Sequence, residues 1–176
     1  LIILDEAYYE FAHDYPNYPD SMNYRYDNVI TLRTFSKAYG LAGIRIGYGF
    51  AHESLIENLI KVKVPFEPSL LAQVAGIAAL DDGDFLQKTL DLNKNGKTYL
   101  TGELKKLKVE TVPSVTNFIT TIWESKEQAA NISNTLLNKG IIVRPLTAFG
   151  WPTCIRISVG LEEENHDFIK KLTEIL

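Results

Sequence analysis

Several side chains in this sequence could bind or transform a small molecule, and they follow apolar runs. Asp5 ends the run Leu1–Leu4, and the pair Ser36-Lys37 follows the run Val29–Leu32. In open α/β sheets, ligands gather beyond the carboxyl ends of parallel strands. If both runs are parallel strands, a carboxylate, a lysine and an arginine could therefore share one crevice. The full set of candidates is Asp5 with Tyr8, Ser36 with Lys37, Arg45, and Arg144 with Arg156.

Each of these residues also has an ordinary structural explanation. An Asp that ends a strand often caps a turn, and a Lys in a loop is usually solvated. Arg45 is harder to explain in this way. The alternation in Gly43–Phe50 predicts a strand with Ile44, Ile46 and later apolar residues on one face and Arg45 among glycines on the other. Such a face indicates that something approaches the backbone closely.

The elements that must position these residues have an α/β pattern. The apolar runs Leu1–Leu4 and Val29–Leu32 are typical of strands that are buried on both faces in a parallel sheet. Helical patterns follow at Glu53–Lys63 and Leu70–Leu80. The acidic cluster Asp81–Asp84 ends the second of these patterns.

We place a domain boundary at the acidic cluster, so that residues 1–83 form one domain and residues 84–176 a second. Gly96 and Gly102 interrupt the first helical pattern of the second domain and make it imperfect. The predicted elements of this domain are a helix at Phe85–Leu107, a strand at Asn117–Trp123, a helix at Glu127–Asn138, strands at Ile141–Leu146 and Cys154–Gly160, and a final helix.

Composition and charge limit the possible function classes. The chain has 176 residues, of which 45% are hydrophobic and 23% charged, as in ordinary folded proteins. Its net charge of −4 has the wrong sign for binding nucleic acid through the overall field. The apolar stretch Ser69–Leu80 is too short for a membrane span, and no Cys/His cluster has the spacing of metal ligands. The single Cys154 suits a reducing, cytoplasmic location.

Three motifs follow one another along the chain: Asp5-Glu6-Ala7-Tyr8, the segment Thr34–Tyr48 with Ser36-Lys37 near its start, and Ile155–Gly160. Their order and the eight-residue step from Lys37 to Arg45 resemble the fold-type I, pyridoxal-phosphate-dependent aminotransferases, over essentially the whole chain. Within that family, Asp5–Phe11 and Leu32–Lys37 are most similar to the histidinol-phosphate aminotransferases.

The resemblance implies pyridoxal 5′-phosphate as the cofactor and a role for each residue of the first domain. Lys37 would hold the cofactor as a Schiff base and then move a proton as general acid and base. Asp5 would face the ring nitrogen and favour its protonated form, and Tyr8 would hydrogen-bond the phenolic oxygen of the ring. The residues implied in phosphate binding are Thr34, Ser36 and Arg45.

The resemblance also implies the substrates and the partners. Arg156 matches the arginine that receives the acid group of the substrate, and Arg144 together with it could grip a phosphate. The alternative interpretation, that Arg144 is an ordinary surface arginine, stays open. The expected reaction transfers the amino group of L-histidinol phosphate to 2-oxoglutarate, in histidine biosynthesis. The active enzyme is expected to be a homodimer that acts on a small-molecule amino donor and a 2-oxo acid, without nucleic acid or membrane.

The fold that the resemblance implies is the remainder of a mainly parallel, helix-covered sheet in residues 1–83 and a small α+β C-terminal domain in residues 84–176. The chain opens on Leu1 inside an apolar run, and its single methionine is Met22. We therefore expect a C-terminal fragment of the enzyme, which would be inactive or only weakly active when isolated.

Two other enzyme interpretations remain open. The first is another aminotransferase, for aromatic or aspartate-type substrates, or a threonine-phosphate decarboxylase, because residues that hold the cofactor do not fix which bond breaks. The second and more remote is a nucleotide hydrolase, since Leu1–Glu6 has the form of a Walker B strand and the chain contains Gly96-Lys97-Thr98. A phosphate loop would need a glycine five residues before Gly96, and Asp91 is there.

Overall fold

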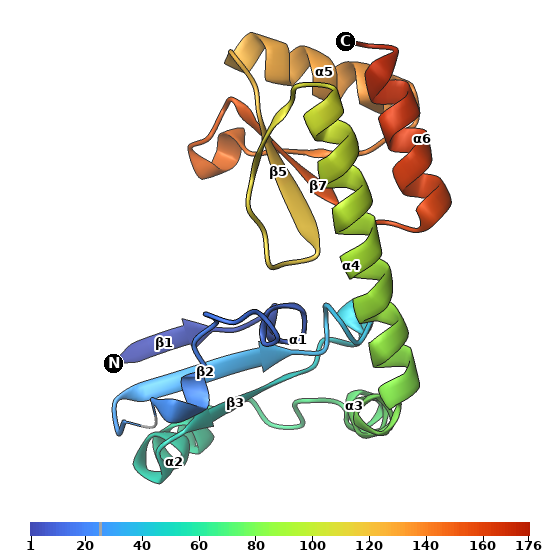
Figure 1. Cartoon of the computed structure of the whole chain (residues 1–176). Helices are drawn as coiled ribbons and strands as arrows, with labels where there is room; N and C mark the ends of the chain where they lie inside the picture. The colour runs from blue at the N-terminus through green and yellow to red at the C-terminus, as the bar shows by residue number, and fades with distance from the viewer. Residues whose placement is uncertain (25) are drawn as a thin grey trace. The chain divides into compact units, whose positions relative to one another are not determined.

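The computed structural model describes residues 1–24 and 26–176 (Figure 1). The chain divides into two units, Leu1–Leu90 and Asp91–Leu176. The boundary predicted between residues 83 and 84 lies at the start of helix α4 (Gly83–Lys106), and the division between the units falls inside this helix. The assignment of the two units as a cofactor domain and a small domain stays a prediction.

The first unit contains a three-stranded sheet with the order β1-β2-β3, made of β1 (Ile2–Asp5), β2 (Val29–Thr34) and β3 (Gly47–Ala51). β1 and β2 are parallel, as predicted, with Asp5 opposite Leu32. β3 is antiparallel to β2. Helices accompany the sheet in this unit (Figure 1). The predicted α/β class is therefore confirmed.

The prediction that the first strand is buried on both faces is wrong for the described residues. Leu1 is 76% exposed and Ile3 59% exposed. β1 pairs with β2 along one edge only, and no other described strand pairs with its second edge. In the middle strand β2 the same prediction holds for Val29, Ile30 and Thr31, which are buried, and fails for Leu32, which is 42% exposed.

The strand predicted over Gly43–Phe50 is also wrong in its first half. Ala42–Ile44 form a 3₁₀ turn, and Arg45 has a left-handed backbone with φ 59°, so the strand begins only at Gly47. The close approach inferred from the glycines is made by the neighbouring strand, since a Cβ at Gly47 would lie 2.9 Å from the Arg33 carbonyl oxygen. Arg45 is thus presented by a turn and not by a strand face.

The two helices predicted in the first unit are confirmed as α2 (Glu53–Val62) and α3 (Leu70–Asp81). The unit also contains two short elements that were not predicted, α1 (Tyr9–Ala12) and the 3₁₀ helix Ser21–Asn23. The Ser69 hydroxyl accepts a hydrogen bond from the Ala72 amide at 3.2 Å and caps α3. Among the described residues, no helix is both long and apolar enough to cross a lipid bilayer.

The second unit has an antiparallel sheet with the strand order β4-β5-β7-β6. Its strands are β4 (Glu110–Val112), β5 (Phe118–Ile122), β6 (Arg144–Pro145) and β7 (Cys154–Ser158), and its helices besides α4 are α5 (Lys126–Asn138), the 3₁₀ helix Thr147–Phe149 and α6 (Glu162–Thr173). The strand predicted over Ile141–Leu146 shrinks to two residues, because only Arg144 and Pro145 pair with β7.

One face of this sheet carries the core of the second unit. Ile119 on β5 and Ile155 and Ile157 on β7 are buried there and form one cluster with side chains of α4, α5 and α6. Those helix residues are Leu100, Leu104, Ala129, Ile132, Leu136, Phe168, Ile169 and Leu172. Because strand side chains alternate, Arg156 points to the opposite face, as its place between two buried isoleucines predicted.

The helix predicted over Phe85–Leu107 is confirmed: α4 runs through Gly96 without a break, although glycine lowers helix propensity. A Cβ at Gly96 would collide with Val159 and would lie 2.9 Å from the Asn165 side-chain nitrogen. The glycine therefore allows α4 to pack closely on the segment that follows β7. The same observation removes the nucleotide-hydrolase interpretation of Gly96-Lys97-Thr98, since these residues form helix interior and not a phosphate loop after a strand.

Candidate active site

The carboxyl ends of β1 and β2 lie at one edge of the first sheet. The Glu6 amide, just after β1, donates to the Leu32 carbonyl at 2.9 Å, which keeps the two strand ends in register. The segments that carry Tyr8 and Ser36-Lys37 therefore leave the sheet at the same edge. This is the placement that parallel pairing of the two apolar runs predicted.

The structure brings Lys37 and Tyr8 together at this edge. Lys37 Nζ lies 5.4 Å from the centroid of the Tyr8 ring, and Lys37 is exposed. The aromatic face attracts the ammonium form of the side chain while leaving the nitrogen open to a ligand. Asp5 is also exposed, and its Oδ1 accepts a hydrogen bond from the Ala7 amide at 3.0 Å. The ordinary explanation of Asp5 as a turn cap is thus correct, and its second carboxylate oxygen can still serve a ligand.

Thr34, Ser36 and Arg45 form a second group beside the lysine. The Ser36 amide donates to Thr34 Oγ1 at 3.1 Å, which closes a tight turn directly after β2. Arg45 Nη1 donates to the Ala42 carbonyl at 2.7 Å and lies 3.5 Å from Ser36 Oγ. The short bond to the carbonyl tethers the guanidinium next to the hydroxyl. A fixed cation beside a hydroxyl donor is an arrangement that suits an anion such as a phosphate.

A buried ion pair connects the two segments that leave the sheet at this edge. Arg33 Nε donates to Glu6 Oε2 at 3.0 Å, with side-chain exposures of 10% and 7%. The Arg33 guanidinium also lies 3.3 Å from the centroid of the Tyr9 ring. Because Glu6 follows Asp5 and Arg33 precedes Thr34, the pair links the two segments that carry the candidate residues. Sequence analysis missed this pair, although Glu6 lies inside the first motif.

Burial changes the acid–base properties of several groups around this ion pair. Desolvation raises the pKa of the Glu10 carboxyl, and its Oε2 is buried without a hydrogen-bond partner among the described residues. Burial likewise raises the pKa of Tyr39 and that of Tyr48, whose rings pack against Phe35. These hydroxyls therefore stay neutral over the physiological range.

In the second unit, Arg144 and Arg156 are direct cross-strand partners. β6 and β7 pair antiparallel with Arg144 opposite Arg156, so both side chains project from the same face of the sheet. Arg156 Nε is buried without a hydrogen-bond partner among the described residues. Two like charges opposite each other are unfavourable, and a bound anion between them would remove that cost. The structure thus places directly opposite each other the two arginines that the resemblance suggested could grip a phosphate together.

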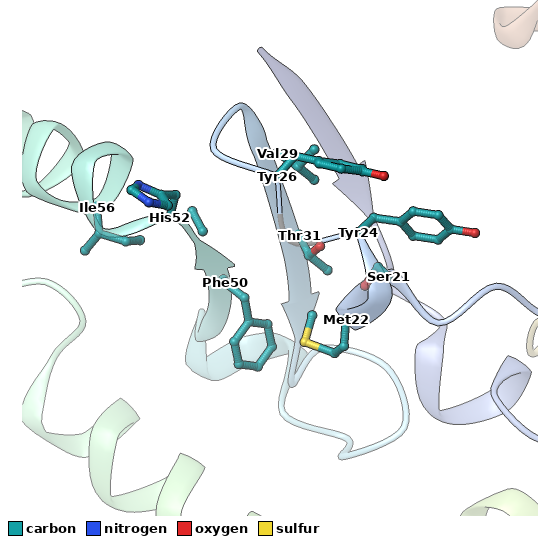
Figure 2. Close-up of a pocket in the computed structure, with 11 residues that line it drawn as sticks. Ser21, Met22, Tyr24, Tyr26, Val29, Thr31, Phe50, His52 and Ile56 are labelled. Carbon is teal, nitrogen blue, oxygen red and sulfur yellow. The ribbon is translucent and has the colours of Figure 1, made fainter.

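The first unit also has hollows, which differ in whether they border these groups. One cavity of about 500 Å³ is lined by Tyr24, Val29, Phe50, Ile56 and neighbouring residues, and Figure 2 shows its aromatic and aliphatic walls. It includes none of the candidate residues. A second hollow of about 490 Å³ borders Asp5 and Glu6. The candidate site is therefore defined by side-chain chemistry at the strand ends and not by the cavity in Figure 2.

Comparisons with known proteins show the family of this chain. The family model described as "Aminotransferase class I and II" matches residues 1–172. The chain belongs to this aminotransferase family. Two curated relatives, both called histidinol-phosphate aminotransferase, come from Nitrosococcus oceani and Bacillus subtilis; each is 43% identical over all of this chain and over 47% and 49% of its own length.

A solved structure supports the same assignment. The histidinol-phosphate aminotransferase from Sinorhizobium meliloti, determined in complex with pyridoxal-5′-phosphate, superposes with a TM-score of 0.87 at 30% identity, over 100% of this chain and 50% of that protein. The aminotransferase chain described here thus spans about half the length of the curated relatives that it matches. The predicted family and fold are confirmed.

Proposed function

We propose that this aminotransferase chain carries the lysine-bearing part of a pyridoxal-phosphate-dependent transaminase. The single observation that carries the proposal is the exposed Lys37 beside the Tyr8 ring, at the strand edge where Asp5 also lies. A reactive amine, a phenol and a carboxylate at one edge are the groups that a pyridoxal ring requires. Family membership and the relatives' names support the same proposal.

The donor set around this edge fits the cofactor. Lys37 is exposed and can form a covalent bond to an aldehyde carbon, and the Tyr8 ring, 5.4 Å from its Nζ, would provide a phenol on the same side of the cofactor ring. Asp5 provides a carboxylate for a protonated ring nitrogen. Ser36, Arg45 and the Thr34 turn supply a hydroxyl and a guanidinium for the phosphate. The group that these residues would hold supplies an electron sink for carbanion chemistry.

The residues at this strand edge then have defined roles in the proposed reaction. The Lys37 amine, when it is not bonded to the cofactor, takes a proton from the α carbon of the amino donor as a general base. Once the amine has taken the proton, the Tyr8 ring face attracts the resulting ammonium group and keeps it at the strand edge. The Glu6–Arg33 pair keeps the two segments at a constant spacing.

The substrate proposal rests on the two facing arginines. A single carboxylate needs one bidentate arginine, whereas a phosphate dianion can satisfy two. Arg144 and Arg156, opposite each other on one sheet face, therefore favour a phosphorylated donor. With the relatives' names, this leads us to L-histidinol phosphate as amino donor and 2-oxoglutarate as acceptor, in histidine biosynthesis, with a cytoplasmic homodimer as the active form. Because the chain spans half of its relatives, the isolated chain would lack part of the site.

Borohydride reduction tests the cofactor proposal without measuring turnover. The protein would be incubated with pyridoxal phosphate, reduced and digested, and mass spectrometry should find the pyridoxyl group on Lys37. Lys37→Ala should lose the label, while Lys61→Ala, which removes an exposed lysine of α2, should retain it. Labelling spread evenly over the surface lysines would contradict the assignment.

Substrate profiling of the holoenzyme tests the donor. L-Histidinol phosphate, phenylalanine, aspartate and threonine phosphate would be compared, and histidinol phosphate should have the highest kcat/KM. A preference for phenylalanine or aspartate would favour another aminotransferase, and release of carbon dioxide from threonine phosphate would favour the decarboxylase.

A further inference from the structure

Phe118 lies directly against one of the two facing arginines. The Arg156 guanidinium carbon lies 4.9 Å from the centroid of the Phe118 ring. Thr120 is the cross-strand partner of Arg156, and Phe118 is two residues earlier on β5, so its side chain shares the face of Thr120 and Arg156. The three side chains and Arg144 form one continuous surface on the sheet face opposite the core.

The arginine pair needs such a support. Arg144 and Arg156 repel each other, and Arg156 Nε is buried without a hydrogen-bond partner among the described residues. Hydrogen bonds from Nε to protein oxygens therefore do not fix the plane of this guanidinium. An aromatic ring within about 6 Å attracts the cation and restricts the tilt of its plane. The two terminal nitrogens of the Arg156 guanidinium, Nη1 and Nη2, can then face an anion.

The position of Phe118 is in turn fixed by helix α4. Asn93 Nδ2 donates to the Thr116 carbonyl at 3.3 Å, and Lys97 Nζ, one helical turn later, donates to the Ser114 carbonyl at 3.2 Å. Thr116 Oγ1 accepts from the Phe118 amide at 3.3 Å and pairs with the Ser114 hydroxyl at 2.9 Å. Lys97 is only 9% exposed. A buried lysine charge is costly unless it is hydrogen-bonded, so the bond from Lys97 to the Ser114 carbonyl holds the lysine and the turn together.

We propose that Phe118 is a positioning residue for the anion-binding Arg156, and that Asn93 and Lys97 hold the turn that sets its ring. This inference deepens the proposed function and rests on it, because it concerns the arginine assigned to the substrate phosphate. Phe118 itself touches the guanidinium and not the reacting atoms. Its effect should therefore appear in the affinity for the phosphorylated donor and not in the chemical step.

The test compares Phe118→Leu with Phe118→Tyr in the holoenzyme, with L-histidinol phosphate and L-histidinol as the two probes. Phe118→Leu should raise KM for L-histidinol phosphate by about two- to five-fold, the range expected for a cation–aromatic contact, with kcat within about two-fold of the parent. Phe118→Tyr keeps the ring and should keep the parent KM. KM for L-histidinol, which has no phosphate, should be the same in all three proteins.

A second pair of variants tests the support from α4. Lys97→Met keeps most of the buried volume and should raise KM for L-histidinol phosphate in the same direction. Lys94→Met, an exposed lysine on the same helix, should leave KM unchanged. Because Lys97→Met could also lower stability, each protein would be assayed below its own unfolding temperature, and the KM ratio between the two probes would be compared.

Arg156→Lys separates the two levels of the proposal. If Arg156→Lys leaves the ratio of the two KM values unchanged, the phosphate assignment fails and the role of Phe118 falls with it. If Arg156→Lys raises KM for L-histidinol phosphate but Phe118→Leu and Phe118→Tyr behave alike, the proposed function stands and the positioning role is refuted. In the Arg156→Lys background, Phe118→Leu should cost less than in the parent, because the two side chains act together.

Discussion

The buried pair Glu6–Arg33 offers the sharpest test of how the site is supported. Arg33 Nε and Glu6 Oε2 are 3.0 Å apart, and the two side chains are 10% and 7% exposed. Removing one member of such a pair leaves the other as an uncompensated buried charge, at a cost of about 3–5 kcal/mol. Only Nε makes the bond, and the Tyr9 ring remains over the guanidinium, so we expect Glu6→Ala to lie near the lower end of that range.

The size of the pair interaction follows from a double-mutant cycle. Arg33→Met should cost about as much as Glu6→Ala, because it strands the Glu6 carboxylate. Glu6→Leu combined with Arg33→Met should cost only about 0–1 kcal/mol, since two apolar side chains of similar volume replace both charges. Glu6→Leu alone should cost about as much as Glu6→Ala, about 3 kcal/mol, because it also strands the Arg33 charge. The cycle formed by Glu6→Leu and Arg33→Met should therefore give a coupling energy of about 5–6 kcal/mol. Glu6→Gln, which keeps an acceptor oxygen, should cost about 1 kcal/mol.

Urea unfolding followed by circular dichroism measures these free energies. The exposed pair Lys139–Glu174, with N···O at 2.7 Å, is the matched control, and Glu174→Gln should not change the midpoint measurably. The reasoning would be refuted if Glu6→Ala cost the same with Met at position 33 as with the native arginine. Equal losses would mean that packing of Glu6, and not its charge partner, explains the effect.

Three further predictions concern other buried groups. Desolvation raises the pKa of the Glu10 carboxyl above its ordinary value of 4.5, so the folded protein binds this proton more tightly than the unfolded chain. The stability that the bound proton contributes is therefore lost as pH rises through the raised pKa. In melting experiments Glu10→Gln should be more stable than the parent at about pH 7 and should lose this advantage near about pH 4. Gly96→Ala should lower the melting temperature, at a cost of about 1–3 kcal/mol from collision with the segment after β7, whereas Gly102→Ala, with open space around it, should gain up to about 1 kcal/mol from helix propensity. Thr121→Val should lower the free energy of unfolding in urea by about 1–3 kcal/mol, because it removes the acceptor of the buried Trp123 indole N–H. In the parent, this N–H lies 2.9 Å from Thr121 Oγ1. An equal loss in Thr121→Ser, which keeps the hydroxyl, would argue against the hydrogen bond as the cause.

The part of the site that could be predicted depends on short stretches of chain. Asp5 and Tyr8 lie three residues apart, and Ser36 and Lys37 are neighbours, so local spacing already places them on common segments. The parallel pairing of β1 and β2 was also predictable, because both apolar runs end just before these groups. Local order was enough to indicate one crevice and the residues at its edge.

What could not be predicted depends on contacts between distant segments. The Glu6–Arg33 pair joins residues 27 apart, and the pairing of Arg144 with Arg156 depends on the register of two strands separated by a turn. Alternation alone placed Arg45 on a strand, since periodicity does not show that a 3₁₀ turn and a left-handed residue interrupt it. The two arginines were named from the sequence, but their being opposite each other was not.

The groups that we propose for anion binding are built differently in the two units. Arg45 is tethered by the Ala42 carbonyl at 2.7 Å, so its orientation is fixed by the protein before any ligand binds. Arg156 has a buried Nε without a described partner and a like charge opposite it, so the ligand itself must supply the compensating charge. A permanently held cofactor phosphate suits the first arrangement, because the protein can be organised around it. A substrate that must be released suits the second, because the repulsion between the arginines returns when the anion leaves and offsets part of the binding free energy.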